Sequence, residues 1–334
     1  MVPPLYRRGG PGARRGRRGV GQGRAAVLQN AAFRNRTAGS GGPALATTIK
    51  LLLTAFFWGG TFIAGRILAA EVGPFSGAFL RFLVAAASLA FFLGLREGLR
   101  PPPGRGDVLR LLLMGMTGVF LYNVFFLLGL KEIEAGRAAV LIANNPIGIA
   151  LGAALFFGER MNAGKIAGIL ISVSGAVIVI TRGDPIAGLR GGFGRGEACI
   201  LLCVVSWVAY SLLGKQAMGR LSPLAAVTWS AVAGALGLLP FALLEGVHAA
   251  ARYSAAAWGS ILYLGLCGTT IGFLWYCEGI QTIGPVRAGL FINFVPVFAV
   301  LLAALLLSEP LTASLLAGAG LVTAGVFLTT RASR

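Results

Sequence analysis

The amino-acid sequence predicts an all-α integral membrane protein whose ten transmembrane helices form two inverted five-helix repeats. Three observations support this fold class. Hydrophobic residues make up 56% of the chain and charged residues 12%, whereas soluble domains carry about 25% charged residues. Apolar blocks of about 20 residues, the length that spans a bilayer, alternate with short polar breaks from residue 45 onward. The two halves of the chain also resemble each other at a fixed spacing.

Residues 1–44 are predicted to be a disordered basic tail outside the helical fold. They are rich in Arg, Gly and Pro, and no Asp or Glu precedes Glu71. Such a composition cannot bury enough apolar surface to fold alone. The net charge of +18 would suit nucleic acid, but most other basic residues lie at the ends of apolar runs. We therefore expect the tail to face anionic membrane lipids and expect no nucleic acid partner.

The apolar runs predict a first repeat at 45–181, a connecting loop at 182–196 and a second repeat at 197–331. Short breaks between runs indicate that helices adjacent in sequence pack as antiparallel neighbours. The ten helices are expected near 46–68, 74–95, 108–129, 137–157, 163–181, 197–217, 223–245, 256–277, 286–307 and 311–330.

A shift of 150 residues places 122–181 over 272–331 without a gap. The aligned pairs are Arg137 with Arg287, Pro146 with Pro296, and Glu159 with Glu309. Because each half has an odd number of helices, the second half enters the membrane from the opposite side. Inverted repeats of this kind are common in transporters, which bind substrate where the repeats meet near the bilayer midplane.

The distribution of Lys and Arg predicts the orientation in the membrane. With the N-terminus inside, twelve of these residues lie at inner helix ends and seven at outer ends, before the tail is counted. The positive-inside rule then places both termini of this multi-pass protein in the cytoplasm, in the cell inner (plasma) membrane.

Sequence signatures of catalysis are absent. There is no P-loop, no G-x-S-x-G and no H-E-x-x-H motif, which argues against ATP hydrolysis, membrane hydrolase and metalloprotease chemistry. Cys199 and Cys203 share a helix face, but no His or carboxylate cluster accompanies them. We therefore predict that the protein is not an enzyme and has no catalytic residues, metal site or cofactor.

Arg81 is the most informative charge for a binding site. It lies seven residues after Pro74, or about 10 Å into the second helix at 1.5 Å per residue. A charge at this depth normally faces the bundle interior or a water-filled cavity. We predict that Arg81 binds an anionic or carboxylate-bearing substrate; the alternative is a structural arginine bonded to backbone carbonyls.

Amides beside helix-interrupting prolines are a second set of candidate substrate contacts. Asn144 and Asn145 precede Pro146 in the fourth helix, and Asn293 lies one turn before Pro296 in the ninth. A proline inside a helix frees a backbone carbonyl and kinks the helix. The amides can therefore bind substrate or satisfy the freed backbone groups.

Aromatic residues and one further amide complete the predicted site. Tyr122 and Asn123 lie in the third helix, Trp275 and Tyr276 in the eighth, and Trp58 in the first. They are predicted to line the substrate pathway. The alternatives are an interfacial aromatic belt for residues near helix ends and tight packing for Trp58.

Carboxylates at helix ends receive a structural interpretation. Glu159 and Glu309 close the fourth and ninth helices, where each is expected to cap the N-terminus of the next helix. Proton coupling is the alternative, and Glu278 is the better candidate for it because it lies at the edge of an apolar run.

Taken together, these features resemble the EamA-type family of the drug/metabolite transporter superfamily over about residues 46–331. The residues that carry the resemblance are Trp58-Gly59, Pro74, Arg81, the Ala-rich run from Ala135 through Pro146 to Gly158-Glu159, Trp275, and the run from Arg287 to Glu309. The resemblance implies a ten-helix carrier with a central cavity and alternating access, often an exporter of amino acids, other metabolites or toxic compounds. Ser230, at the position equivalent to Arg81, departs from strict symmetry between the halves.

The sequence thus predicts a secondary transporter that exports small metabolites such as amino acids or amphipathic toxic compounds. The predicted cavity is lined by the first, third, fourth, sixth, eighth and ninth helices. A channel and a non-transporting multipass scaffold are the alternatives. The sequence also allows a homodimer.

Overall fold

The fold is described from a computed structural model, which places residues 41–99, 104–158, 161–184, 194–217, 221–283 and 285–332. The described residues from Thr47 onward form one compact unit. Most of the predicted basic tail, Glu159 and most of the predicted connecting loop lie outside the described residues.

Ten helical segments of the described chain are long and apolar enough to cross a membrane, which confirms the predicted fold class. Six of them are continuous α-helices: α2 (Gly41–Glu71), α3 (Pro74–Arg96), α8 (Ala163–Ile180), α10 (Arg195–Ala217), α11 (Pro223–Glu245) and α16 (Ala313–Arg331). Large apolar side chains face outward, with Leu244 87% and Leu305 78% exposed. Surfaces of this kind require a lipid solvent.

The third and eighth transmembrane segments each contain a stretch of π-helix. The third consists of α4 (Arg105–Met114), η1 (Gly115–Leu121) and α5 (Tyr122–Glu132), and the eighth of α12 (Ala255–Leu262), η4 (Tyr263–Ile271) and α13 (Gly272–Ile283). The two π-helical stretches occupy equivalent positions in the two repeats. Because π-helical turns are rare and cluster at functional sites, they direct attention to this level of the bundle.

The fourth and ninth segments are interrupted. The fourth consists of α6 (Ala135–Ile142) and α7 (Asn145–Phe157), and the ninth of α14 (Pro285–Ile292) and α15 (Phe294–Leu307). Pro146 and Pro296 lie in the first turn of the second piece, where the missing N–H removes no helical bond. The predicted kinks are therefore short breaks in the helix.

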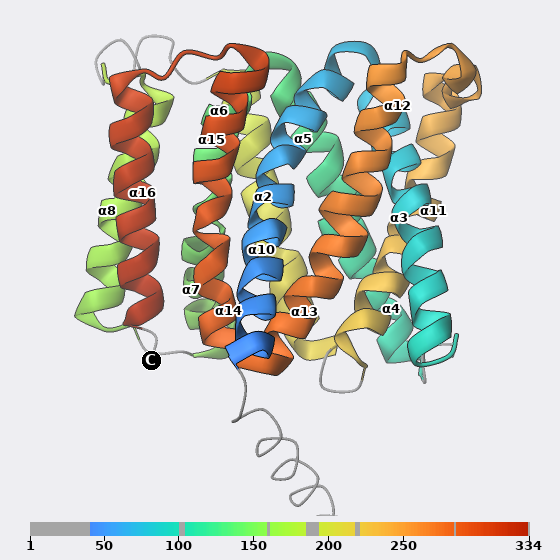
Figure 1. Ribbon diagram of the computed structural model, residues 1–334, viewed down its shortest axis with the longest axis horizontal. Helices are drawn as coiled ribbons and strands as arrows, with labels where there is room; N and C mark the ends of the chain where they lie inside the picture. Colours follow the sequence, from blue (N-terminus) through green and yellow to red (C-terminus); the bar gives the residue numbers. More distant parts are fainter. Residues whose placement is uncertain are drawn as a thin grey trace, which may run out of the picture. The chain divides into compact units, whose positions relative to one another are not determined.

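Contacts between equivalent helices show that the halves are inverted copies. α8 and α16 pack side by side (Figure 1), with Gly168 opposite Gly325 and Gly175 opposite Gly318. A Cβ at Gly175 would lie 2.7 Å from the carbonyl oxygen of Gly318. This crossed pairing is what an antiparallel pair of equivalent helices produces, and small residues permit such close approach in a membrane.

The two ends of the bundle are named from Figure 1. The lower end is the one at which α3 ends and α11 begins, and the upper end is the one at which α3 begins and α11 ends. A short 3₁₀-helix, η3 (Val247–Arg252), follows α11 at the upper end.

Candidate functional site

Arg81 lies in the interior of the bundle, as the sequence predicts. Its side chain comes from α3 and is only 7% exposed. Nη1 donates to Asn123 Oδ1 at 2.7 Å and Nη2 to Thr269 Oγ1 at 3.2 Å, while the guanidinium lies 5.1 Å from the centre of the Phe82 ring. Arg81 thus connects the third segment of the first repeat to the eighth segment in the second.

The partners of Arg81 are themselves attached to the π-helical stretches. Asn123 Nδ2 donates to the carbonyl oxygens of Gly118 and Val119 in η1, at 3.3 and 2.8 Å. Thr269 Oγ1 donates to Leu264 O in η4 at 2.9 Å. The side chains that bind the guanidinium therefore also donate to backbone carbonyls of the two π-helical stretches. Asn123 and Arg81 were both predicted from the sequence; Thr269 was missed, because a threonine in an apolar run has no distinguishing pattern.

The predicted aromatic residues make three separate ring contacts. Trp58 packs against Tyr276 with a ring-centroid distance of 5.4 Å and donates Nε1–H to Gly268 O in η4 at 2.9 Å. Tyr122 instead packs on Trp207 at 5.4 Å. Trp275 stacks on Phe57 at 5.8 Å. Only Trp58 and Tyr276 of the predicted aromatic residues are thus in contact with each other.

The predicted amides lie at the helix breaks. Asn144 Nδ2 donates to Val140 O and Leu141 O at 3.3 and 3.2 Å, and Asn144 Oδ1 accepts from Ser172 in α8 at 2.7 Å. Asn144 therefore satisfies the carbonyls at the break, which was the structural alternative. Asn145 Oδ1 is buried and has no hydrogen-bond partner within the described ranges. Asn293 is the N-cap residue of α15 and makes no side-chain capping bond.

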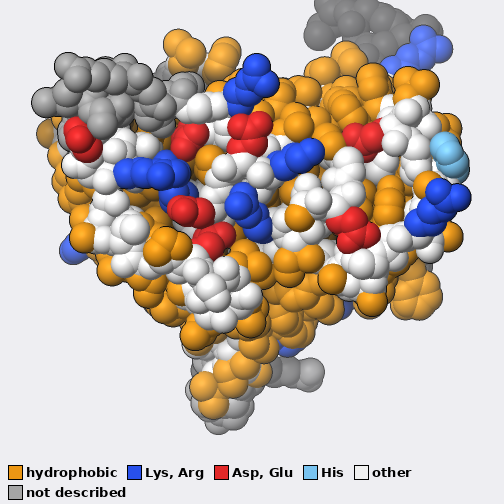
Figure 2. Space-filling view, turned by 90° about the horizontal axis from the view of Figure 1, so that it is seen from above, with side chains coloured by type: hydrophobic (Ala, Val, Ile, Leu, Met, Phe, Trp, Pro, Cys, Tyr) orange, Lys and Arg blue, Asp and Glu red, His pale blue; other side chains and the backbone are white. Residues whose placement is uncertain are grey.

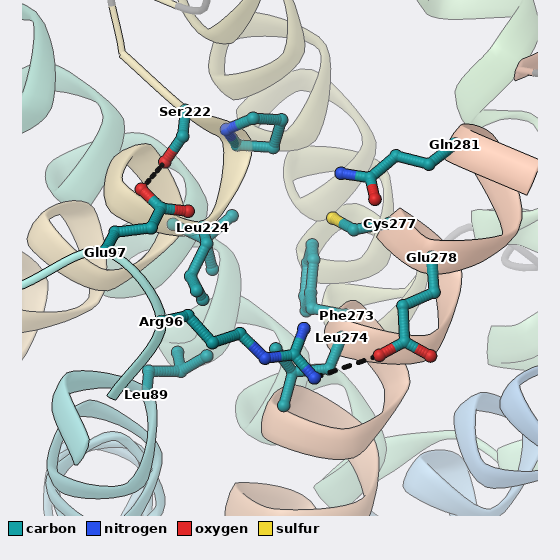
Figure 3. A pocket seen from close by; sticks show the side chains of 12 residues that line it. Leu89, Arg96, Glu97, Ser222, Leu224, Phe273, Leu274, Cys277, Glu278 and Gln281 are labelled. Carbon is teal, nitrogen blue, oxygen red and sulfur yellow. Dashed lines mark hydrogen bonds and ion pairs between the residues drawn. The ribbon is translucent and has the colours of Figure 1, made fainter. Parts of the chain in front are cut away.

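A cavity of about 280 Å³ lies at the lower end, where α3, α11 and α13 meet. Figure 3 shows the side chains of α13 facing those of α3 and α11 across it. None of the nine predicted site residues lines this lower cavity. Its lining residues are Leu89, Arg96, Glu97, Ser222, Pro223, Leu224, Val227, Phe273, Leu274, Cys277, Glu278 and Gln281.

Charged side chains surround the mouth of the lower cavity. Glu278 accepts from Arg96 Nη2 at 3.0 Å and from Lys50 Nζ at 2.8 Å. Across the cavity, Glu97 Oε2 accepts from Ser222 Oγ at 2.5 Å (Figure 3). Glu278, the predicted candidate for proton binding, is therefore held in two ion pairs.

At the upper end, polar side chains join the two repeats directly, and charged groups of both signs are visible there in Figure 2. Glu71 accepts from Ser254 N at 2.6 Å, and Glu245 accepts from Ser76 N at 2.6 Å. Arg137 forms an ion pair of 2.9 Å with Glu197, and each side chain is 7% exposed. These links connect residues 60 or more positions apart, so no local pattern indicates them.

Glu309 corrects one expectation from the sequence. It was predicted to cap the next helix, but that helix, α16, is capped by Thr312. Glu309 instead accepts from Ala135 N at 2.8 Å and Gly136 N at 3.0 Å, at the N-terminus of α6 in the other repeat. A carboxylate is favourable at any helix N-terminus, and packing brings α6 rather than α16 to it. This contact is a fourth link between repeats at the upper end.

Comparisons with known proteins agree with this architecture. Residues 46–181 and 194–331 each match the EamA-like transporter family. A relative from Streptantibioticus cattleyicolor, named "Probable terminal-alkyne amino-acid exporter", is 31% identical over 84% of this chain and 92% of its own length. The "Uncharacterized inner membrane transporter YicL" of Salmonella typhimurium is 28% identical over 86% of this chain and 95% of its own.

A solved structure supports the fold. A crystal structure described only as that of a protein superposes with a TM-score of 0.56 at 22% identity, covering 86% of this chain and 98% of the other. The family match spans both repeats, and the relatives named above are similar over most of their length. The protein is thus a multi-pass membrane transporter, and the chain belongs to the EamA-like transporter family.

Proposed function

We propose that the protein is a secondary transporter that exports small metabolites, such as amino acids or amphipathic toxic compounds, by alternating access between its two repeats. The observation that carries the proposal is the cavity that lies between the two repeats at the lower end of the bundle. Polar links join the repeats at both ends, through Glu71, Glu245, Arg137 and Glu309 at the upper end and through Glu97 and Glu278 at the lower end. A carrier that is open to one side has a cavity of this kind between its repeats.

The proposed substrate class rests on the side chains inside the bundle. Arg81 would bind a carboxylate, and Asn123, Asn145 and Asn293 would supply further polar contacts. The aromatic residues Trp58, Tyr122, Trp275 and Tyr276 would contact apolar parts of the substrate. The similarity to a relative named as an amino-acid exporter supports the same class.

The proposed orientation rests on the distribution of charge. The excess of Lys and Arg at one set of helix ends favours a cytoplasmic location for both termini, so the lower end would face the cytoplasm. Substrate would then enter from below and leave after the upper links break, which is export across the plasma membrane.

Counterflow in proteoliposomes tests the proposal. Liposomes preloaded with unlabelled L-phenylalanine or L-leucine should accumulate the same radiolabelled amino acid transiently, because a carrier exchanges substrate across the membrane. A channel equilibrates label without overshoot, and a scaffold moves none. Absence of exchange over a panel of amino acids, nucleosides and cationic drugs would refute the proposal.

A cross-linked variant tests whether the upper end must open, and the single-cysteine variants are its matched controls. In a protein with its four native cysteines replaced by alanine, Glu71→Cys and Ser254→Cys place thiols at an upper link. A short bifunctional maleimide should abolish exchange, because the upper end can no longer open, while each single variant treated identically should retain it. Exchange that persists after complete cross-linking would contradict alternating access at this end.

A further inference from the structure

We propose that the lower cavity is a second substrate site, which binds a zwitterion with one carboxylate, one ammonium and an apolar group before it passes into the bundle. This inference rests on the proposed transport function and names the substrate chemistry of its entry side. Along α3, the lining residues Leu89 and Arg96 lie 8 and 15 positions beyond Arg81, or about 12 and 22 Å at ~1.5 Å per residue. The charged groups at the mouth of the cavity are therefore distinct from Arg81.

The charges at the cavity favour a net-neutral ligand. Arg96, Glu97 and Glu278 line the cavity, and Lys50, which pairs with Glu278 from outside the lining, brings the formal charge of these four residues to zero. Both signs of charge are thus available to a ligand at the mouth of the cavity. A zwitterion adds one charge of each sign and keeps the balance.

The positions of the charged groups match the two ends of such a ligand. Arg96 donates to Glu278 through Nη2, and its side chain is 49% exposed, so its planar guanidinium is accessible to a carboxylate that binds arginine in a bidentate manner. Glu97 follows Arg96 at the end of α3, but its carboxylate points to Ser222 at the N-terminus of α11, whereas the Arg96 guanidinium points to Glu278 (Figure 3). The ligand ammonium would bind there.

The apolar walls and the volume limit the rest of the ligand. Leu89, Leu224, Val227, Phe273 and Leu274 line the cavity and offer no partner to a polar group. At about 30 Å³ of liquid volume per water molecule, 280 Å³ corresponds to about nine waters. A free amino acid with an aliphatic or aromatic side chain has a comparable number of non-hydrogen atoms.

The cavity adjoins the predicted pathway. Phe273 lines it and also packs against Trp58 at a ring-centroid distance of 5.9 Å. Trp58 in turn contacts Tyr276 and the π-helical stretch η4. A ligand in the lower cavity is thus separated from the Trp58–Tyr276 pair by one aromatic ring, which would have to move to admit it.

Protection of a native cysteine tests the proposal. Cys277 lines the cavity, and Cys199→Ala, Cys203→Ala and Cys267→Ala leave it as the only cysteine of the chain. The rate of alkylation of Cys277 by N-ethylmaleimide is measured in detergent with L-phenylalanine, N-acetyl-L-phenylalanine or phenethylamine. A concentration ten times the Kd leaves about one eleventh of sites empty, so L-phenylalanine should slow alkylation about tenfold.

The analogues and two variants identify the cause of protection. N-acetyl-L-phenylalanine lacks the ammonium and phenethylamine lacks the carboxylate, so neither should protect at the same concentration. Arg96→Gln and Glu97→Gln should each abolish protection by L-phenylalanine, whereas Arg252→Gln at the upper end should not. Protection by neither L-phenylalanine nor L-leucine, or equal protection by all three aromatic compounds, would overturn the proposal.

The outcome separates this site from the transport function. Counterflow without protection of Cys277 would exclude the lower cavity as a zwitterion site while leaving the carrier intact. Protection with the expected selectivity but without counterflow would confirm the site and refute the carrier.

Discussion

The bond between Arg81 and Asn123 can be tested by a double-mutant cycle. Arg81→Met leaves Asn123 Oδ1 buried without its 2.7 Å donor, which costs about 1–3 kcal/mol of unfolding free energy. Asn123→Leu leaves the buried guanidinium without its shorter bond, at a cost of about 1.5–3 kcal/mol for a hydrogen bond to a charged group. The double variant leaves neither group unpaired, so its destabilisation should be smaller than the sum of the two single effects.

The coupling energy can be worked from the contacts that remain. Thr269 keeps its bond to Leu264 O in every variant. The Asn123 bonds to η1 are lost in Asn123→Leu whether or not Arg81 is present. Neither contribution to the free energy of unfolding therefore affects the coupling energy. The expected coupling is about 1.5–3 kcal/mol, at the upper range for contacting residues. At about 2–4 °C per kcal/mol for a large domain, Arg81→Met should raise the Tm of Asn123→Leu relative to additivity by several degrees.

The assay is thermal unfolding of purified protein in detergent, followed by size-exclusion chromatography with fluorescence detection. The control is the cycle of Arg81→Met with Asn144→Leu. The side chain of Asn144 bonds only to residues of α6 and α8 among its described contacts, so the effects of these two substitutions on stability should be additive. Additivity in the Arg81–Asn123 cycle would refute the reasoning, because it would mean that the two side chains do not stabilise each other. Unchanged transport of a carboxylate substrate by Arg81→Gln would remove Arg81 from the proposed binding site.

Two further predictions concern the packing of the repeats. Gly175→Leu should destabilise the protein by about 1–3 kcal/mol or more, because its Cβ would lie 2.7 Å from Gly318 O and overpacking forces the helices apart. Gly320→Leu is the control and should leave Tm unchanged, because there is open space at its Cβ. Equal Tm values for the two variants would contradict the close α8–α16 contact. Glu309→Ala should lower Tm by a few degrees, since it removes two charge-assisted bonds at the N-terminus of α6 worth about 1–2 kcal/mol together. Glu134→Ala, on the N-cap residue that makes no side-chain cap, is its control, and an equal loss in that variant would exclude capping as the cause.

Much of the fold follows from local properties of the sequence. Hydropathy and length predict all ten transmembrane segments, and the proline positions predict where the fourth and ninth are interrupted. The interior location of Arg81 follows from its depth in an apolar helix, since a charge there cannot face lipid. These conclusions need only the identity of residues along one helix and the solvent around it.

The partners of these residues depended on the tertiary structure. Arg81 binds Thr269, which is 188 residues away, and Glu309 caps α6 rather than the adjacent α16. Both contacts depend on which helices packing brings together, and hydropathy is nearly the same on all of them. The π-helical stretches η1 and η4 likewise depend on packing, because the hydropathy of an apolar run does not distinguish an α-helix from a π-helix.

By itself, the sequence determined that the chain spans the membrane ten times as two inverted repeats, because burial in lipid imposes length, apolarity and internal backbone bonding on every span. Only the tertiary structure decided which polar links join the repeats at the two ends and that the repeats flank a cavity at the lower end. Those features arise where helix ends from different repeats meet. Polar residues are expected at every helix end, so their composition alone does not reveal which ends are in contact.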